Sequence, residues 1–407
     1  MLNWANRFSI FCLLDNHQYQ LQPHSVECML AVGMRRSFSL TNHAFGDLQN
    51  FIDQKPGWLF GHLGYDLKNV IEGLHSSHPD YIGFPDLFFF EPELVIRLTT
   101  NEITIDGNNA EKQYQDILNT SDFLQAQPQS VTINNRFSRE EYIAVINTLR
   151  EHILRGDCYE INFCQEFFAE NAEIDPIAVY NGLSAVSPNP FSALYKLDDR
   201  FLICASPERY LRKSGERLLS QPIKGTARRN ISNDADDLFT KEQLYHSAKD
   251  RSENVMVVDL VRNDLSKVCK EGTVKTDELY GVYPFPQVYQ MISTISGELK
   301  DDISFTDILK ATFPMGSMTG APKHNVLKLI EQYEKTKRGI FSGALGYITP
   351  SGDFDFNVVI RSIMYNATAK YLSFQAGSGI TFYSDPVKEW EECLLKAEAI
   401  RKVLTNT

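Results

Sequence analysis

The sequence has no paired cysteines, no long uncharged apolar run and no block of basic residues, and each absence excludes a class of protein. The seven cysteines are scattered without a Cys-x-x-Cys pair, which favours a reducing compartment over a disulfide framework. Without a long apolar run, or an apolar signal core behind basic residues, we expect a cytoplasmic protein with no membrane contact. The formal net charge of −12 argues against a nucleic-acid partner, since phosphate neutralisation needs clustered cations.

Two short motifs are also absent, and they exclude two activities. The Walker spacing G-x-x-x-x-G-K-[ST] does not occur, so the chain has no nucleotide-binding loop of that kind. No Gly-x-Cys-x-Gly elbow occurs either, so we expect no glutaminase within this chain, by analogy with the Gly-x-Ser-x-Gly elbow. What is present is an ordinary globular composition over 407 residues, 43% hydrophobic and 23% charged. With this negative charge, an anionic substrate would need a local cation or metal.

The hydrophobic pattern predicts mixed strands and helices. Residues 1–100 alternate short apolar runs with turn signals, as strands with short helices do. Residues 138–153 have helical periodicity, with Ser138 and Glu141 in capping-box positions. After Gly156, strand-like runs end in polar or glycine-rich clusters from which helices begin. Because functional groups are commonly mounted on loops held by a rigid sheet, we expect the chemistry in this part of the chain.

Two clusters offer a carboxyl and an amine. An apolar strand in residues 201–211 ends at Ser206-Pro207 and then presents Glu208, although a lone glutamate at a strand end is usually only solvated. Lys224 is followed at once by Gly225 and Thr226. The glycine lets a ligand approach the backbone closely, and the threonine adds a hydroxyl. Taken alone, the lysine of a Lys-Gly-Thr sequence is more often an ordinary surface lysine than a functional one.

Two further clusters carry paired acids. Asp250 and Glu253 are three residues apart near the start of an expected helix, and Glu389 and Glu392 repeat this spacing in the last one. Each pair therefore shares one helix face. Two such faces could meet across a magnesium ion, which needs only one or two carboxylates plus water and substrate oxygens. First-turn acids that complement a helix dipole, or plain solvated acids, are the simpler reading of either pair.

The remaining cluster residues are glycines, serines and prolines. In residues 313–333 a Gly/Ser loop leads to Pro322, which suits a first helical position, so this helix N-terminus is either an anion site or a plain turn. In residues 375–397, Gly377, Ser378 and Gly379 are expected to interrupt a strand. Asp385 and Pro386 are then expected to cap and open the final helix.

In this order and spacing, the five clusters resemble the chorismate-binding enzyme family. It includes component I of anthranilate synthase, component I of aminodeoxychorismate synthase, and the isochorismate and salicylate synthases. The resemblance covers residues 138–405, while residues 1–135 are less typical. It implies an α+β fold in which two large antiparallel β-sheets pack as a sandwich with flanking helices, with the site between them. Residues 1–407 would then form a single domain.

Lys224 indicates the branch of the family. The run Pro222–Thr226 reads Pro-Ile-Lys-Gly-Thr, which resembles the aminodeoxychorismate branch, whereas anthranilate synthases resemble Pro-Ile-Ala-Gly-Thr. The resemblance implies that Lys224 attacks C2 of chorismate and that ammonia then displaces it, giving 4-amino-4-deoxychorismate on the route to p-aminobenzoate and folate. The attacking amine must be neutral, so we expect the pKa of Lys224 to be lowered. Glu208 would protonate the departing C4 oxygen.

The resemblance also assigns the groups that bind metal and substrate. The Mg²⁺ ligands would be Glu253 and Glu392, with Asp250 and Glu389 as supporting acids, and the metal would neutralise the ring carboxylate of chorismate. Residues implied to contact the substrate are Gly225, Thr226, Tyr347, Arg361, Gly377, Ser378 and Gly379. Among these, Tyr347, Arg361 and the amides from Gly377 to Gly379 would hold the enolpyruvyl carboxylate, for which a bidentate arginine is suited.

One position separates the branches, and two other places depart from the family pattern. Glu160 stands where the water-using branches place a base lysine, which argues against isochorismate or salicylate synthesis. Gln290 stands where the family often has His, so any step assigned to that His is in doubt. The run Leu13–Asn16 only partly matches the Leu-Leu-Glu-Ser-like motif by which some members bind tryptophan.

Other functions stay open at this stage. Ammonia would come from solution or from a separate glutamine amidotransferase subunit. The nearest rival is component I of anthranilate synthase, and a rival of another class is a catalytically silent chorismate-binding regulatory subunit. The intact set of Lys224, Glu208, Glu253 and Glu392 argues against a silent subunit. A generic phosphate-binding protein is disfavoured because the acidic pairs would repel phosphate without a metal.

Overall fold

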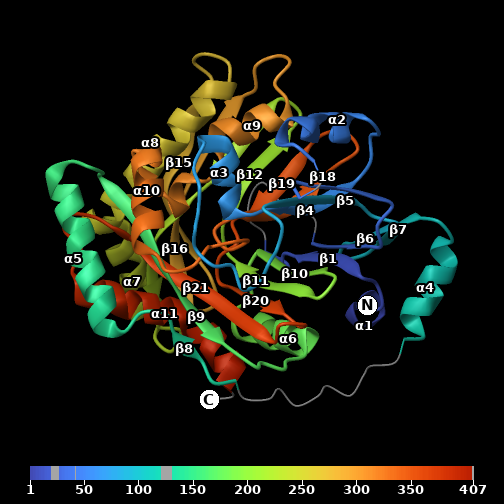
Figure 1. The fold of residues 1–407 in the computed structure, drawn as a ribbon, viewed down its shortest axis with the longest axis horizontal. Coiled ribbons are helices and arrows are strands. Elements are labelled where there is room, and N and C mark those ends of the chain that lie inside the picture. Colours follow the sequence, from blue (N-terminus) through green and yellow to red (C-terminus); the bar gives the residue numbers. More distant parts are fainter. Residues whose placement is uncertain (20–26, 42, 121–130, 406–407) are drawn as a thin grey trace.

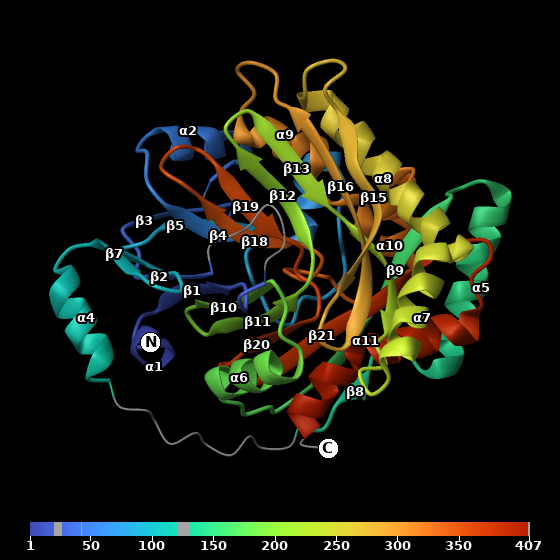
Figure 2. The same ribbon diagram turned by 180° about the vertical axis from the view of Figure 1, so that it is seen from behind.

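Two antiparallel sheets form the centre of the molecule in a computed structural model that describes residues 1–19, 27–41, 43–120 and 131–405. Within these residues one sheet has eleven strands and the other has ten. Figures 1 and 2 show the sheets packed together, with helices gathered on their outer sides. The expected α+β sandwich is confirmed.

The eleven-stranded sheet contains strands from both ends of the chain. In spatial order the strands are β17 (Gly320–Ala321), β9 (Glu160–Ala169), β21 (Tyr371–Ile380), β20 (Ser362–Asn366), β11 (Arg200–Ser206), β10 (Phe191–Leu197), β1 (Ile10–Asp15), β2 (Cys28–Val32), β6 (Leu94–Leu98) and β7 (Ile103–Gly107), with β8 (Asn134–Asn135) beside β9. Strand β9 thus pairs with β21 although more than two hundred residues separate them in sequence.

The ten-stranded sheet is likewise interleaved. Its strands in spatial order are β14 (Ile223–Arg228), β16 (Val288–Glu298), β13 (Arg217–Gln221), β12 (Arg209–Ser214), β19 (Phe354–Asn357), β18 (Ala344–Ile348), β4 (Leu59–Leu63), β5 (Leu87–Glu91) and β3 (Arg36–Ser39), with β15 (Lys275–Pro284) beside β16. Both sheets therefore combine strands from the first hundred residues with strands from residues 138–405.

The helices lie outside the sheets (Figures 1 and 2). They are α1 (Leu2–Ala5), α2 (Leu48–Asp53), α3 (Lys68–Glu72), α4 (Ala110–Leu118), α5 (Arg139–Arg155), α6 (Pro176–Val186), α7 (Asp234–His246), α8 (Ala248–Val268), α9 (Phe305–Thr312), α10 (Lys323–Tyr333) and α11 (Pro386–Thr405), with short 3₁₀ turns η1 (Phe45–Asp47), η2 (Tyr65–Leu67) and η3 (Gly316–Met318). None of these helices is both long and apolar enough to cross a membrane.

The eleven-stranded sheet is buried on both faces, and its strand alternation shows how. In β1, Ile10 and Cys12 belong to the core shared with the ten-stranded sheet, whereas Phe11 and Leu13 point into a second core. Side chains along a strand alternate between its faces, so one strand supplies both cores. The second core is closed by helices α5, α6, α10 and α11.

Local sequence signals locate two helices that frame the site. The Ser138 hydroxyl accepts a hydrogen bond from the Glu141 amide, and the Glu141 carboxylate accepts one from the Ser138 amide. The capping box expected before α5 is therefore confirmed. The Asp385 carboxylate accepts from the amides of Val387 and Lys388 and caps α11 as expected. The predicted helix starts are correct where a side chain close in sequence fixes them.

Two local predictions were wrong. Residues 377–379 do not interrupt a strand, because β21 continues to Ile380 and keeps its full register with β9. A Cβ on Gly377 would lie 1.9 Å from the Phe163 carbonyl oxygen, so this glycine permits close strand approach instead of a break. Pro322 is the N-cap of α10 in extended conformation, one residue before the helix, because Ala321 still pairs with β9.

A buried ion pair ties the site-bearing segments together. Arg338 and Glu334 join at 2.6 Å, and their side chains are 1% and 5% exposed. The Arg338 guanidinium also donates to the carbonyl oxygens of Met318 at 2.7 Å and Asn162 at 2.8 Å. The Glu334 carboxylate accepts from the Cys164 amide. One charge pair thereby anchors both the loop of η3 and the start of β9.

All seven cysteines are free, in agreement with the absence of a disulfide framework. Six of them are buried, and burial raises their pKa values because it disfavours the thiolate. They act as small apolar core residues.

We expect Glu334→Ala to destabilise the protein by about 3–5 kcal/mol, since it would leave the buried Arg338 charge without a partner. Urea unfolding followed by tyrosine and tryptophan fluorescence measures this. Glu216→Ala is the matched control. It breaks an ion pair with Lys270 in which Glu216 is 74% exposed, and it should cost no more than about 1 kcal/mol. Equal losses in the two variants would contradict the anchoring role of Arg338.

Candidate active site

Three ionisable side chains converge where the two sheets meet. Glu208 lies in the link between β11 of the eleven-stranded sheet and β12 of the ten-stranded sheet. Lys224 is the second residue of β14, at the edge of the ten-stranded sheet, and Glu160 is the first residue of β9 in the other sheet. Residues from distant parts of the chain therefore share one site.

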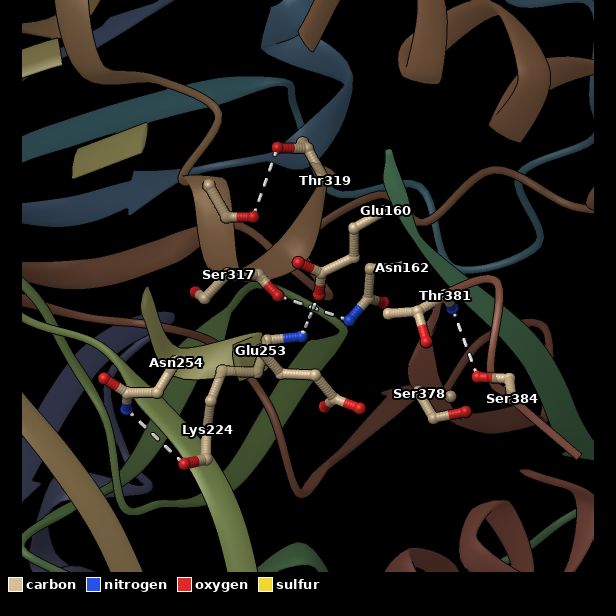
Figure 3. Close-up of polar contacts among 12 residues, drawn as sticks. Glu160, Asn162, Lys224, Glu253, Asn254, Ser317, Thr319, Ser378, Thr381 and Ser384 are labelled. Carbon is tan, nitrogen blue, oxygen red and sulfur yellow. Dashed lines mark hydrogen bonds and ion pairs between the residues drawn. The ribbon is translucent and has the colours of Figure 1, made fainter. Parts of the chain in front are cut away.

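Lys224 and Glu160 form an ion pair between the sheets, as Figure 3 shows. The Lys224 Nζ lies 2.7 Å from the Glu160 Oε1, and the two side chains are 10% and 5% exposed. Burial alone would lower the pKa of Lys224. The charges of Glu160 and Glu253 and the hydrogen bond to Glu160 outweigh burial and raise it. The expectation of a lowered pKa was wrong, because it counted burial and a metal but not these carboxylates.

Glu208 is held in a dry environment. Its side chain is buried, and its Oε1 accepts a hydrogen bond of 2.6 Å from the Ser317 hydroxyl of η3. Burial raises the pKa of Glu208 to about 7, while Ser317, the charge of Lys224 and the Ile223 amide oppose the rise. Near neutral pH the folded protein can therefore keep a proton on this carboxyl, as a general acid requires.

The backbone around Lys224 is fixed on both sides. Gly225 has φ +101°, a conformation that favours glycine, and a Cβ there would lie 3.1 Å from Asp250 of α8. The Asn254 amide is 3.5 Å from the Lys224 carbonyl oxygen. The Thr226 hydroxyl donates to the Gln290 side chain at 2.8 Å. Helix α8 thus sets where the edge strand presents its lysine.

The predicted acidic pairs meet through a lysine. Lys249 Nζ is 3.8 Å from Glu253 Oε1 on α8 and 3.7 Å from Glu389 Oε1 on α11. Among the described residues, both oxygens are buried and have no hydrogen-bond partner. Two such oxygens facing one cation are suited to hold a divalent metal. Asp250 is instead hydrogen-bonded to the Ser247 hydroxyl at the start of α8.

Burial also raises the pKa of Glu253 to about 7, and the nearby carboxylates of Glu160 and Glu392 add to the rise, although Lys224 and Lys249 oppose it. A cation added near Glu253 would stabilise its ionised carboxylate. Across the described residues no set of three or more His, Cys, Asp or Glu side chains is already gathered as a metal cage. The acids are therefore positioned in pairs, with protein cations between them.

A second set of polar groups surrounds the end of β21. Glu392 pairs with Lys396 at 2.7 Å, and Lys396 also donates to the Gly377 carbonyl oxygen at 2.8 Å. The Arg361 Nη1 is 3.5 Å from the Lys396 carbonyl oxygen. Ser378 donates to Glu389 at 2.5 Å. The structure thus brings Arg361, residues 377–378 and both acids of α11 to one region.

Tyr347 lies elsewhere. Its ring packs against Trp58 and Phe60 and lines a small cavity. That cavity is also lined by Leu14, Asp15 and Asn16, the run compared with the tryptophan motif. Lys224 and Glu208 are not among the lining residues, so the structure does not bring Tyr347 to the Lys224 site.

Sequence reasoning missed three polar residues of the site. Lys249 and Lys396 each lie four residues before or after a predicted acid, a spacing that could have identified them as its partners. Ser317, which holds Glu208, was noted only as part of a glycine-serine loop. No local signal marks it, because its partner is 109 positions away.

Comparisons with known proteins show the family and the fold. A family model described as chorismate binding enzyme matches residues 15–402. An anthranilate synthase component I-like protein of Synechocystis is 33% identical over 89% of this chain and 76% of its own length. Aminodeoxychorismate synthase component 1 of Bacillus subtilis is 30% identical over 89% and 79%. Anthranilate synthase component I of Streptococcus pneumoniae superposes with a TM-score of 0.82, at 24% identity, over 95% of this chain and 94% of that one.

We expect Gly379→Ala to separate the Lys224–Glu160 pair. A Cβ at this position would lie 2.6 Å from both Lys224 Nζ and Glu160 Oε1. Because the pair holds Lys224 as an ammonium, its loss should speed acylation of Lys224 by an amine-reactive ester at pH 8 roughly tenfold, the effect of one unit of pKa. Peptide mass spectrometry measures the rate.

The control for this prediction is Gly46→Ala, since nothing lies within 4 Å of a Cβ there. It should leave Lys224 labelling at the parent rate. Unchanged labelling in a folded Gly379→Ala protein would show that the pair tolerates the added methyl group.

Proposed function

Because the chain belongs to the family of chorismate-binding enzymes, we propose that it aminates chorismate at C4 to give 4-amino-4-deoxychorismate. The observation that carries the proposal is the buried Lys224 amine, which lies at the junction of the sheets beside a carboxyl that can stay protonated near neutrality. An alanine at this position could form no bond to the substrate. The relatives bear names of both amination branches at similar identity, so the branch rests on the residues of the site.

The reaction proceeds in two displacements that use these residues in turn. The neutral Lys224 amine attacks C2 of chorismate, the two ring double bonds shift, and the C4–O bond breaks. Glu208 gives its proton to the departing oxygen, which leaves as water. Ammonia then attacks C4, the double bonds shift back, and the bond between C2 and Lys224 breaks.

The acids on α8 and α11 fit a magnesium ion in this scheme. The partnerless buried oxygens of Glu253 and Glu389 would be ligands, so Glu389 takes the place that the resemblance implied for Glu392. Glu392 and Asp250 would then be the supporting acids. When bound, Mg²⁺ would offset the charge of the substrate's ring carboxylate in a chain whose net charge is −12. Lys249 occupies the space between the two oxygens and would have to move aside.

Cations and amides at the end of β21 suit the second carboxylate of chorismate. Arg361 offers a fork of donors, and Lys396 adds an ammonium beside Gly377. The Ser378 hydroxyl, if released from Glu389, and the backbone of residues 377–379 where it is not bonded to β9 would complete this set. Tyr347, assigned to the same carboxylate from the sequence, gains no support from its position in the other cavity.

Gln290 favours the aminodeoxychorismate branch over anthranilate synthesis. The anthranilate route must also eliminate pyruvate, and that elimination moves a proton. Gln290 stands where the family often has His, it is buried, and its side-chain oxygen accepts from Thr226. An amide cannot act as an acid or a base near neutral pH.

Ammonia would reach this chain from a glutamine amidotransferase. The sequence has no Gly-x-Cys-x-Gly elbow, and several relatives are named as one component of a synthase. A separate subunit that releases ammonia at the mouth of the site would supply the second nucleophile, and ammonium salts should replace it in a test tube.

The first test is the product formed from chorismate, Mg²⁺ and ammonium. Mass spectrometry should find 4-amino-4-deoxychorismate, and Lys224→Ala should reduce its rate more than about 1000-fold, as loss of a covalent nucleophile does. Chelation of the metal should stop the reaction in the parent protein. Lys310→Ala, which removes a half-exposed lysine of α9, should be fully active.

Other outcomes separate the rivals. Anthranilate with pyruvate would show the anthranilate branch and leave Lys224 with another role. Tight chorismate binding without turnover, even with an amidotransferase present, would show a silent subunit.

We expect Glu208→Gln to be inactive and to change how stability depends on pH. The pKa of Glu208 is raised from 4.5 to about 7 in the folded protein, which therefore holds more protons than the unfolded chain between these values. The stability from this group is present below pH 4.5 and lost as pH rises through 7, a change of about 3 kcal/mol. Because Gln carries no ionisable proton, the variant should not lose this stability as pH rises. Urea unfolding at pH 5 and pH 8 measures the difference. If the free energy of unfolding changed equally with pH in parent and variant, the pKa of Glu208 would not be raised in the folded protein.

A further inference from the structure

Glu160 is the only described residue whose side chain is hydrogen-bonded to the Lys224 amine. Its carboxylate is 5% exposed, and its Oε1 lies 2.7 Å from Lys224 Nζ. Figure 3 shows the two side chains pointing toward each other. A buried carboxylate needs a partner, and here the partner is the Lys224 amine itself, which brings the lysine proton within hydrogen-bond distance of a possible acceptor.

The backbone holds Glu160 in place from both sides. Glu160 opens β9 and pairs with Ala321 of β17 on one side. On the other side Ile161 pairs with Ile380 of β21. Next to this pairing, Gly379 lacks the Cβ that would lie 2.6 Å from both charged atoms. The fold thus keeps open the space that the Lys224–Glu160 pair fills.

The other carboxyls near Lys224 have different partners. Glu208 is engaged by Ser317 and keeps a proton for the departing oxygen. Glu253 faces Lys249 and the place of a cation. Neither touches the lysine nitrogen through a hydrogen bond in the described residues, so only Glu160 can take its proton directly.

We propose that Glu160 is the positioning residue for Lys224 and accepts its proton before the lysine attacks chorismate. This inference rests on the proposed function, since it specifies how the nucleophile becomes neutral. It also gives a use to a residue that would otherwise only mark the absence of the water-activating lysine.

The proton and the electron pairs balance over the cycle. The Lys224 ammonium gives one proton to the Glu160 carboxylate, and the freed lone pair forms the bond to C2. The C4–O bond breaks onto oxygen, which takes the proton of Glu208 and leaves as water. When ammonia has attacked C4, the C2–N bond breaks onto nitrogen, and the lysine recovers its proton from Glu160. The ammonium formed at C4 gives one proton to the Glu208 carboxylate, so both acids return to their starting state and the net products are 4-amino-4-deoxychorismate and water.

The test compares Glu160→Gln with Glu160→Asp in the intact chain. Gln keeps the length and one hydrogen-bond acceptor but takes up no proton, whereas Asp keeps the carboxylate and withdraws it by one methylene. Loss of a proton acceptor should lower kcat of Glu160→Gln about 100-fold with KM for chorismate within threefold of the parent value. Glu160→Asp should retain more kcat than Glu160→Gln.

A purely structural role gives the opposite order. The longer, isosteric Gln would then keep more activity than Asp, and that order would overturn the inference, as would a kcat of Glu160→Gln within threefold of the parent. Glu166, which lies on β9 like Glu160, offers the matched control, since Glu166→Gln weakens its ion pair with Arg136 and does not touch Lys224. It should lower the unfolding midpoint and leave kcat unchanged.

Failure of the proposed function appears separately. If the parent protein makes no 4-amino-4-deoxychorismate, or if Lys224→Ala makes it at the parent rate, the lysine route itself is wrong. If the parent is active, Lys224→Ala is inactive and Glu160→Gln is fully active, only the assignment of Glu160 is wrong.

Discussion

The ion pair between Lys224 and Glu160 is the contact on which the site depends, because it joins the two sheets at their common edge. Its partners lie on β14 and β9, which belong to different sheets. A buried pair of this kind requires close geometry, since either charge alone would cost several kcal/mol in a dry interior. Gly379 leaves room for the two charged groups because it has no Cβ. The Arg338–Glu334 pair anchors the start of β9.

Crowded negative charge is the second constraint on the site. Burial raises the pKa values of Glu208 and Glu253 to about 7, and for Glu253 the charges of Glu160 and Glu392 add to the rise. Lys249 and Lys396 offset part of this charge by contacting acids on α8 and α11. In the proposed reaction, an added divalent cation and the loss of a proton from Lys224 would act on the same field, so metal binding and nucleophile activation would be electrostatically coupled.

Elements defined by neighbours in sequence could be predicted, and those defined by distant strands could not. The capping box of Ser138 and the Asp385 cap both use side chains within three residues, and both predictions are confirmed. The expected break at residues 377–379 was wrong because glycine there serves the pairing with β9. The same explanation covers Pro322, where one more residue of strand pairing delays the helix.

The sequence by itself determined the family, the two-sheet α+β fold and the likeness of Lys224 and Glu208 to known catalytic positions, since ordered motifs record them directly. Only the tertiary structure decided which charges face one another. It placed Glu160 against Lys224 across 64 positions and reversed the expected direction of the Lys224 pKa. It also placed Tyr347 in a cavity that neither Lys224 nor Glu208 lines. The physical reason is that a pKa or a contact depends on distances through space, which interleaved strands set without any local signal.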